Sequence, residues 1–141
     1  MFSVMVSMLI VLIFVYAAVS KLIDFDRYQT AMYNQVFPHR ITDLLIWLLP
    51  ASELTFAGLL SFEKTRCWGM IASGILMACF TAYTAAVLLH LFQRVPCTCG
   101  GLFSELGWTA HFILNFSCLL LLIMGIGVRC KYSFNKHKKF S

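Results

Sequence analysis

The chain alternates four long apolar stretches with short polar segments. The apolar stretches are Phe2–Leu22, Leu44–Phe62, Trp68–Phe92 and Trp108–Val128. Crossing the ~30 Å hydrocarbon layer of a bilayer takes about 20 apolar residues in a helix, and each stretch meets that requirement. The pattern therefore predicts an all-α membrane protein, a four-transmembrane-helix bundle that forms a single domain over residues 1–141.

A shorter pattern lies between the first two spans. Phe25, Tyr28, Met32 and Val36 recur at helical spacing with polar residues between them. This spacing predicts a short amphipathic helix that lies on the membrane surface and ends near Pro38.

Small residues recur at every fourth position of the third span, at Gly74, Ala78, Ala82 and Ala86. Such a stripe lets another helix approach closely. We therefore expect a helix contact along it.

The composition agrees with a membrane class. With 60% hydrophobic and 12% charged residues, the chain has far more apolar surface than a soluble domain of its size buries. No positive charge precedes the first span, which is also longer than the ~7–15 residues of a signal-peptide core. We therefore expect the first span to be retained as a helix.

The net charge of +5 is unevenly distributed. If four helices cross, seven basic residues share the side of the termini, namely Lys64, Arg66, Arg129, Lys131, Lys136, Lys138 and Lys139. The other side holds four, namely Lys21, Arg27, Arg40 and Arg94. The positive-inside rule then predicts a cytoplasmic C-terminus and an extracytoplasmic loop before the fourth span, a prediction that depends on the basic tail. That tail is expected to contact lipid headgroups and not nucleic acid.

Two thiols stand in the polar segment before the fourth span. They are Cys97 and Cys99 in the sequence Pro96-Cys97-Thr98-Cys99-Gly100-Gly101. Paired thiols cycle between dithiol and disulfide through a mixed disulfide, and a ring closed across one residue is strained and therefore labile. The pattern favours a thiol exchange site at the membrane surface. A static disulfide or two unpaired thiols are the alternatives.

No metal site is predicted for this chain. Two thiolates with His90 or His111 would offer donors for copper or zinc, but their spacing matches no four-ligand zinc pattern.

Four further cysteines lie in or near the last two spans, at Cys67, Cys79, Cys118 and Cys130. Twelve residues separate the two cysteines on each helix, which turns them about 120° apart. At most one of the pairs Cys79/Cys118 and Cys67/Cys130 is therefore expected to meet. Packing thiols are the simpler interpretation.

Glu53 is the one ionisable residue deep within the four spans. A carboxyl group near mid-membrane is costly unless it is paired or neutral, and acids in spans are by default candidates for function. We expect Glu53 to handle protons, with a protonated packing residue as the alternative. Lys21, near the outer end of the first span, is expected to stabilise a thiolate or to pair with an acid.

Trp108, His111, Asn115 and Cys118 lie along one face of the fourth span. His111 is placed to take or give the proton that thiol exchange or quinone reduction requires, with a helix-capping or loop-bonding role as the alternative. Asn115 is expected to hold helices together rather than to bind a ligand, and Trp108 to anchor the span at the interface.

Taken in order, these residues resemble the MauE branch of the DoxX-like membrane proteins. The matching motifs are Ser20-Lys21-Leu22-Ile23-Asp24, Pro50-x-x-Glu53, Pro96-Cys97-Thr98-Cys99-Gly100-Gly101 and Trp108 through His111 to Asn115. The resemblance implies a four-helix bundle in a bacterial inner membrane, linked with methylamine utilisation. It also implies a role in maturation of exported, disulfide-containing proteins beside a thioredoxin-like partner.

Vitamin K epoxide reductase-like proteins offer a more distant analogy, with four helices, thiols and a quinone. They carry Cys-x-x-Cys in a helix, whereas this chain has Cys-x-Cys in a loop. A quinone is the one candidate cofactor that the analogy raises.

The preferred hypothesis is a membrane thiol–disulfide redox protein. Its Cys97/Cys99 pair would exchange electrons, in either direction, with an extracytoplasmic thioredoxin-like protein. The rival is a non-catalytic maturation factor or a structural subunit of a larger membrane complex, in which the cysteines form a fixed bridge. A small-molecule transporter is disfavoured, because four helices with one deep ionisable residue leave little material for a polar pathway.

Overall fold

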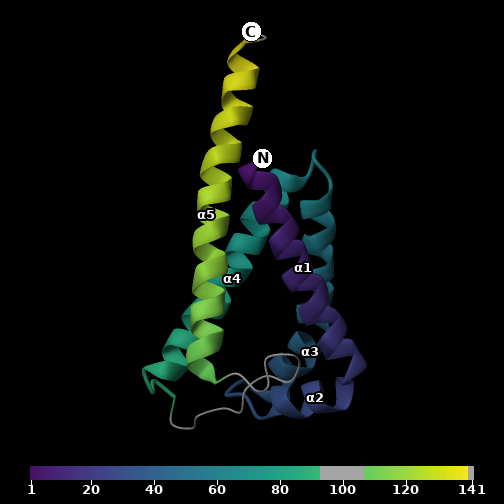
Figure 1. Ribbon diagram of the computed structural model, residues 1–141. Coiled ribbons are helices and arrows are strands. Elements are labelled where there is room, and N and C mark those ends of the chain that lie inside the picture. Colours follow the sequence, from purple (N-terminus) through teal and green to yellow (C-terminus); the bar gives the residue numbers. More distant parts are fainter. Residues whose placement is uncertain (93–106, 140–141) are drawn as a thin grey trace.

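The computed structural model describes residues 1–92 and 107–139, with side chains described as far as Arg129. Five helices follow one another along the chain (Figure 1). They are α1 (Phe2–Ile23), α2 (Phe25–Tyr33), α3 (His39–Ser61), α4 (Arg66–Leu88) and α5 (Trp108–Lys139). Four of them are long and apolar enough to cross a membrane, which confirms the predicted all-α fold with four spans.

Two helix ends differ from the predicted ends of the apolar stretches. At both, backbone conformation and not hydrophobicity determines where the helix begins or ends. α3 begins at His39, directly after Pro38, because the fixed φ of proline favours a helix start there. α4 ends at Leu88, short of the predicted Phe92. Its last turn is closed by bonds from the amides of His90 and Leu91 to the carbonyls of Val87 and Ala86, with His90 at a positive φ of 53°.

The predicted amphipathic helix is α2, which ends at Tyr33 and not near Pro38. Its buried Tyr28 and Met32 pack against Ile46 at the start of α3. Tyr33 also donates a hydrogen bond to the Asp43 carboxylate, and this bond raises the pKa of the Tyr33 hydroxyl. α2 is thereby fixed to the first part of α3.

The long helices form two pairs that meet at one end and diverge at the other. The most extensive contacts join α4 to α5 and α1 to α3, while α1 meets α5 less extensively. Figure 1 shows α1 and α5 close together near the N-terminus and far apart where α2 crosses the bundle. We call the end with the N-terminus and the α3–α4 turn the closed end, and the end with α2 the open end.

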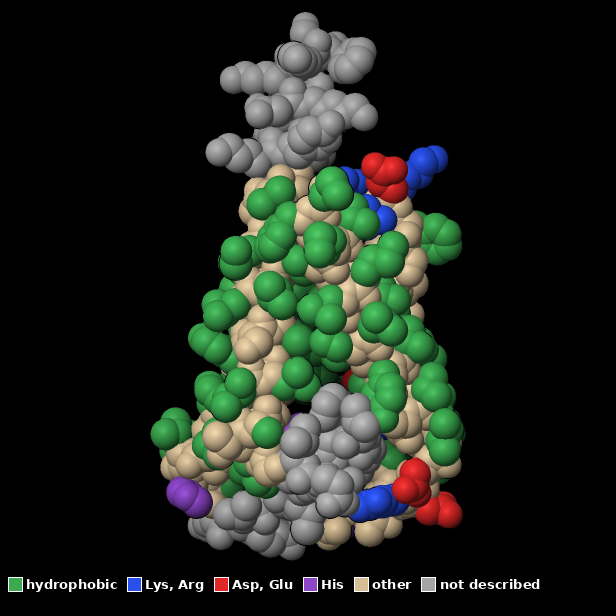
Figure 2. Space-filling model, viewed as in Figure 1, with side chains coloured by type: hydrophobic (Ala, Val, Ile, Leu, Met, Phe, Trp, Pro, Cys, Tyr) green, Lys and Arg blue, Asp and Glu red, His purple; other side chains and the backbone are tan. Residues whose placement is uncertain are grey.

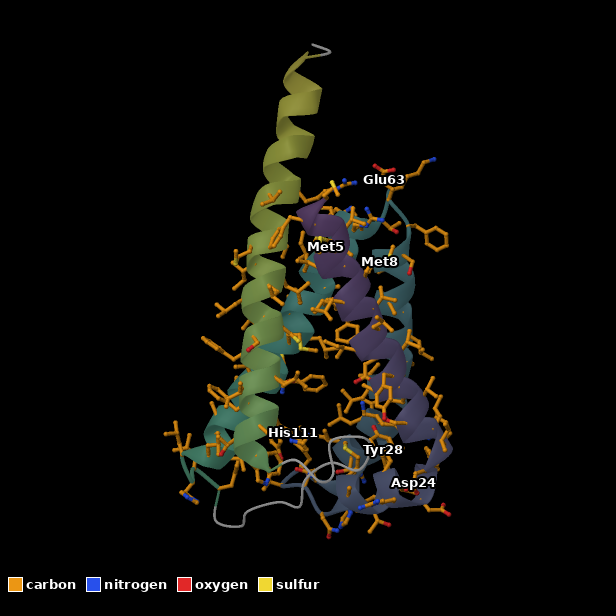
Figure 3. The ribbon with its side chains drawn as sticks, in the orientation of Figure 1. Met5, Met8, Asp24, Tyr28, Glu63 and His111 are labelled. Carbon is orange, nitrogen blue, oxygen red and sulfur yellow. The ribbon has the colours of Figure 1, made fainter. Side chains whose placement is uncertain are left out.

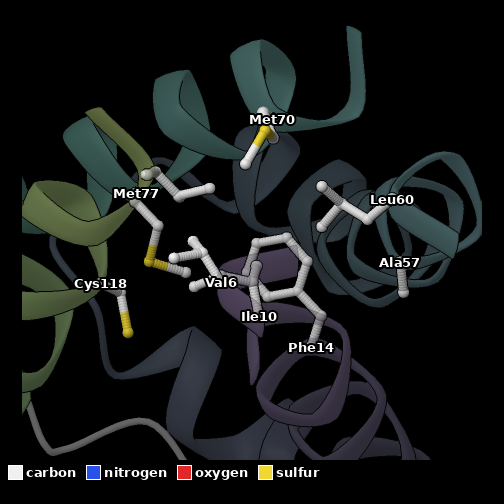
Figure 4. Close-up of a cluster of buried hydrophobic side chains, with 9 residues drawn as sticks. Val6, Ile10, Phe14, Ala57, Leu60, Met70, Met77 and Cys118 are labelled. Carbon is white, nitrogen blue, oxygen red and sulfur yellow. The ribbon is translucent and has the colours of Figure 1, made fainter. Parts of the chain in front are cut away.

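A dry core fills the closed end and the middle of the bundle (Figure 4). Ile10 from α1, Met70 from α4 and Leu122 from α5 have no exposed surface. Two glycines permit this close packing. A Cβ at Gly69 would lie 2.9 Å from the Leu60 amide nitrogen, and one at Gly125 would lie 2.6 Å from the Met70 methyl group.

The predicted small-residue stripe on α4 is not a continuous helix contact. A Cβ at Gly74 would lie in ordinary contact with Ile126 of α5, at 3.8 Å, but Ala78 and Ala82 are exposed. The closest approach between α4 and α5 at a glycine is instead at Gly125, where a Cβ would meet the Met70 methyl group.

On the face shown in Figure 2, hydrophobic side chains cover the middle of the bundle, and most charged side chains lie near its two ends. Large apolar residues such as Leu12, Trp47 and Ile75 are more than 60% exposed. Exposed apolar surface on this scale suits lipid and not water. The chain is therefore a multi-pass membrane protein.

Candidate functional site

A cavity of about 730 Å³ lies where the two helix pairs diverge. All five helices contribute to its wall, which is mostly apolar and rich in aromatic side chains. The polar side chains on the wall include Lys21, Gln35, Glu53, Tyr83, His111 and Asn115. The cavity thus joins several groups that are far apart in the sequence.

The strongest polar contact in the cavity is between Lys21 of α1 and Glu53 of α3. The Lys21 ammonium lies 2.7 Å from one carboxylate oxygen of Glu53 and 2.9 Å from the other. Only 14% of the Lys21 side chain and 3% of the Glu53 side chain are exposed. A third, long contact of 3.4 Å joins the ammonium to the Ala17 carbonyl.

Helix periodicity explains how the two charges meet. Glu53 continues a buried stripe on α3 that also contains Thr42, Ile46, Ala57 and Leu60. This stripe faces α1, whose last turn carries Lys21. The acid therefore points at the neighbouring helix and its cation, and not at lipid.

The ion pair is expected to add little net stability to the fold. Removing two charges from water is expensive, and their mutual attraction often only offsets that loss. Ionisable side chains inside spans usually mark functional sites. A paired acid and base that both line a cavity are therefore a candidate site rather than a packing device.

The opposite wall of the cavity comes from the start of α5. Trp108, His111 and Asn115 all line it, and the rings of Trp108 and His111 lie 6.3 Å apart. His111 Nδ1 is 3.3 Å from the Gly107 carbonyl. Figure 3 shows His111 at the open end together with Tyr28 and Asp24, with Glu63 at the closed end.

Two of the cysteines noted in the sequence, Cys79 and Cys118, lie in different environments. Cys118 is buried in the dry core, so the polar face predicted for α5 ends at Asn115. Cys79 lines the cavity, and both it and Cys118 are free cysteines. Cys97 and Cys99 lie outside the described residues, as does the side chain of Cys130.

The sequence interpretation missed Gln35 and Tyr83. Tyr83 donates a 2.6 Å hydrogen bond to the side-chain amide oxygen of Gln35. The amide NH₂ group of Gln35 in turn donates to the Ala31 carbonyl at 3.1 Å. The Tyr83 ring stacks on Phe37 at 5.3 Å and meets the edge of Trp108 at 6.2 Å. The only available signal was one polar residue, Gln35, after the amphipathic helix.

Metal ligands are not grouped in the described part of the chain. Within residues 1–92 and 107–129, no three His, Cys, Asp or Glu side chains are placed to hold an ion. The cavity offers instead one cation, one anion, an imidazole, two phenols and amides in an apolar surrounding. Such a set binds and orients a mainly apolar molecule and can move protons.

Four apolar spans around a cavity with a buried ion pair define a multi-pass membrane protein with an intramembrane site. The sequence model of the family described as methylamine utilisation protein MauE matches residues 1–128. The chain belongs to this family. No curated protein and no solved structure matches it.

Proposed function

We propose that this protein is a membrane thiol–disulfide redox protein that assists the maturation of exported, disulfide-containing proteins. Membership of the MauE family associates the chain with methylamine utilisation. In the proposal, Cys97 and Cys99 form the exchanging pair, and an extracytoplasmic thioredoxin-like protein is the redox partner. The membrane is the bacterial inner membrane, with the C-terminus in the cytoplasm.

One observation carries the proposal most directly. The segment with Cys97 and Cys99 follows α4 and precedes α5, and both helices line the cavity that contains the Lys21–Glu53 pair and His111. The thiols are thus connected by short lengths of chain to the only described site with proton-carrying groups inside the spans. This supports chemistry that couples electrons to protons.

The proposed exchange is balanced between the two proteins. The thiolate of one cysteine attacks the partner's disulfide, forming a mixed disulfide and releasing one partner thiolate. The second cysteine attacks the mixed disulfide, which closes the Cys97–Cys99 bond and releases the second partner thiolate. Two electrons pass to the partner, and the two protons lost by Cys97 and Cys99 are taken up by its thiolates. In the reverse sequence, the partner's dithiol reduces the Cys97–Cys99 disulfide and is itself oxidised to a disulfide.

The other site residues have supporting roles in the proposal. Glu53 and His111 handle protons, and Lys21 holds the Glu53 carboxylate in place. Trp108 and Asn115 shape the wall beside His111. None of these residues forms a covalent bond in the exchange.

Thiol trapping in defined redox buffers tests the exchange. The protein in lipid nanodiscs is equilibrated with reduced and oxidised dithiothreitol, then alkylated with a maleimide that adds mass to each free thiol. We expect Cys97 and Cys99 to convert together at a potential well above that of structural disulfides. A pair that stays oxidised in excess, accessible reductant would overturn the proposal. The variant Cys79→Ser, which leaves Cys97 and Cys99 in place, is the matched control.

Single substitutions test the partner. Cys97→Ser or Cys99→Ser removes the thiol that resolves the mixed disulfide, so we expect one variant to accumulate a covalent complex with the thioredoxin-like protein. Cys79→Ser should accumulate none. Normal client maturation by the double serine variant, at normal protein level, would instead support the non-catalytic maturation factor or structural subunit.

A further inference from the structure

We infer that the cavity between the diverging helix pairs binds a neutral, membrane-soluble molecule of the quinone class. The inference deepens the proposed function and rests on it for the redox role. The binding site itself is argued from the size, apolarity, charge and hydrogen-bonding groups of the cavity.

The cavity has the size of a ligand site and not of a packing defect. Its volume of about 730 Å³ falls within the ~300–1,000 Å³ typical of pockets for small organic ligands. Voids between well-packed helices are rarely much larger than a water molecule. The dry core at the closed end shows that these same helices can pack without such a space.

The wall of the cavity suits a flat ring. Aromatic side chains reach it from different elements, among them Phe14 of α1, Phe56 of α3, Phe80 and Tyr83 of α4 and Trp108 of α5. Aromatic rings prefer stacked or edge-to-face partners, which a planar ligand supplies. Because helices long and apolar enough to cross a membrane line the cavity, its surroundings suit a molecule that dissolves in the bilayer.

The charges of the site favour a neutral ligand. Lys21 and Glu53 compensate each other at 2.7 Å, so an ion of either sign would enter a mostly apolar space without an unpaired counter-charge. A neutral molecule with local dipoles loses less solvation on entry. Ketone oxygens on an apolar ring fulfil this condition.

Two groups on opposite walls can meet those oxygens. The Lys21 ammonium makes its third contact to Ala17 at 3.4 Å, long enough for a ligand carbonyl to replace it with a better bond. The Asn115 amide lines the cavity on α5 and makes no hydrogen bond to the residues that the structure describes. A ring with oxygens at both ends uses both groups.

A quinone also completes the redox balance. In the direction in which the partner's dithiol reduces the Cys97–Cys99 disulfide, the two resulting thiols return to the disulfide by releasing two electrons and two protons. A quinone takes up both to become a hydroquinone, with two new O–H bonds. It would serve as the membrane-soluble electron acceptor for the thiol pair.

Tryptophan fluorescence measures the binding. Trp108 lines the cavity, whereas Trp47 and Trp68 are 64% and 72% exposed. The reporter protein carries Trp47→Phe and Trp68→Phe, together with Cys97→Ser and Cys99→Ser so that thiol chemistry cannot contribute. Decyl-ubiquinone is titrated into nanodiscs, and we expect saturable quenching of Trp108. A matched protein that retains only Trp47 should show quenching that rises in proportion to the quinone-to-lipid ratio without saturating.

One matched pair of variants and one double variant test the cavity itself. Ala72→Phe fills the cavity and should abolish saturable quenching, whereas Ala78→Phe, exposed on the same helix, should leave it unchanged. The double variant Lys21→Met/Glu53→Met removes both charges together and should weaken binding on the order of tenfold, the loss expected for one good polar contact. Fluorescence-detected size exclusion confirms that each variant is folded.

The outcomes separate this inference from the proposed function. Quenching of Trp108 that never saturates, or that persists in Ala72→Phe, overturns the quinone site even if thiol trapping succeeds. Saturable quenching that Ala72→Phe removes supports the site even if the Cys97/Cys99 pair proves inert.

Discussion

The two ends of the bundle use the same helices in opposite ways. At the closed end, Ile10, Met70 and Leu122 pack with no exposed surface, and Gly69 lets the backbones of α3 and α4 approach closely. At the open end the helix pairs diverge around a cavity, and its wall carries the Lys21–Glu53 ion pair, an imidazole and amides. The buried polar groups toward the other end are hydroxyls such as those of Ser7 and Ser73. Close packing and the candidate chemistry are therefore separated along the length of the bundle.

The largest expected effect comes from breaking the ion pair at the open end. Glu53→Leu leaves the Lys21 ammonium buried without its partner, at a cost of about 3–5 kcal/mol of unfolding free energy. The double variant Lys21→Met/Glu53→Met should recover most of that loss. Thermal unfolding in nanodiscs, followed by circular dichroism, compares the three proteins. Equal loss in the single and double variants would show that the pair itself stabilises the fold.

A slightly smaller loss of unfolding free energy is expected from a cavity created in the core at the closed end. Leu122→Ala removes a fully buried side chain and should cost about 2 kcal/mol, the low end for such changes, because lipid supplies no hydrophobic driving force between helices. Leu120→Ala, on the same helix but 46% exposed, should cost little. Unfolding in a denaturing detergent titration measures both. Similar losses would mean that the closed end is not tightly packed.

A glycine substitution tests how closely α3 and α4 approach each other at the closed end. Gly69→Ala should cost about 1–2 kcal/mol, because the new methyl group would meet the Leu60 backbone at 2.9 Å and force α3 and α4 apart. Gly58→Ala, which meets nothing within 4 Å, should be neutral or mildly stabilising in a helix. The same thermal assay applies. A neutral Gly69→Ala would contradict the close approach at the α3–α4 turn.

The smallest effect concerns the attachment of α2. The Asp43 carboxylate raises the folded-state pKa of Tyr33 above its unfolded value of about 10. The hydrogen bond therefore contributes stability below pH ~10 and loses it as the pH rises through the folded-state pKa. Tyr33→Phe should be slightly less stable than the parent at neutral pH and equal to it at high pH. A pH-independent difference would point to ring packing.

The fold was largely predictable because the hydrophobic pattern alone determines four spans and an amphipathic element. The ends of the spans were less so, since Pro38 and the left-handed His90 set them through backbone geometry. The site was predictable in part. Lys21 pairing with an acid was one of two stated alternatives, and the face from Trp108 to Asn115 does line the cavity.

The rest of the site depends on tertiary packing that no local pattern carries. Nothing near Tyr83 in sequence indicates that its hydroxyl meets Gln35, 48 residues away. Cys118 shares a helical face with His111, but Cys118 is buried in the hydrophobic core, whereas His111 lines the cavity. The two helix pairs come together between these two positions of α5. The divergence of the pairs, and hence the cavity, is a property of the whole bundle.

The Lys21–Glu53 contact also constrains how the protein enters the membrane during synthesis. Each charge alone in the middle or end of a span raises the free energy of insertion by up to ~3 kcal/mol. The two residues belong to α1 and α3, which are consecutive spans of the chain. The helical hairpin from Phe2 to Ser61 is therefore the smallest unit that can pass into lipid without an unpaired charge.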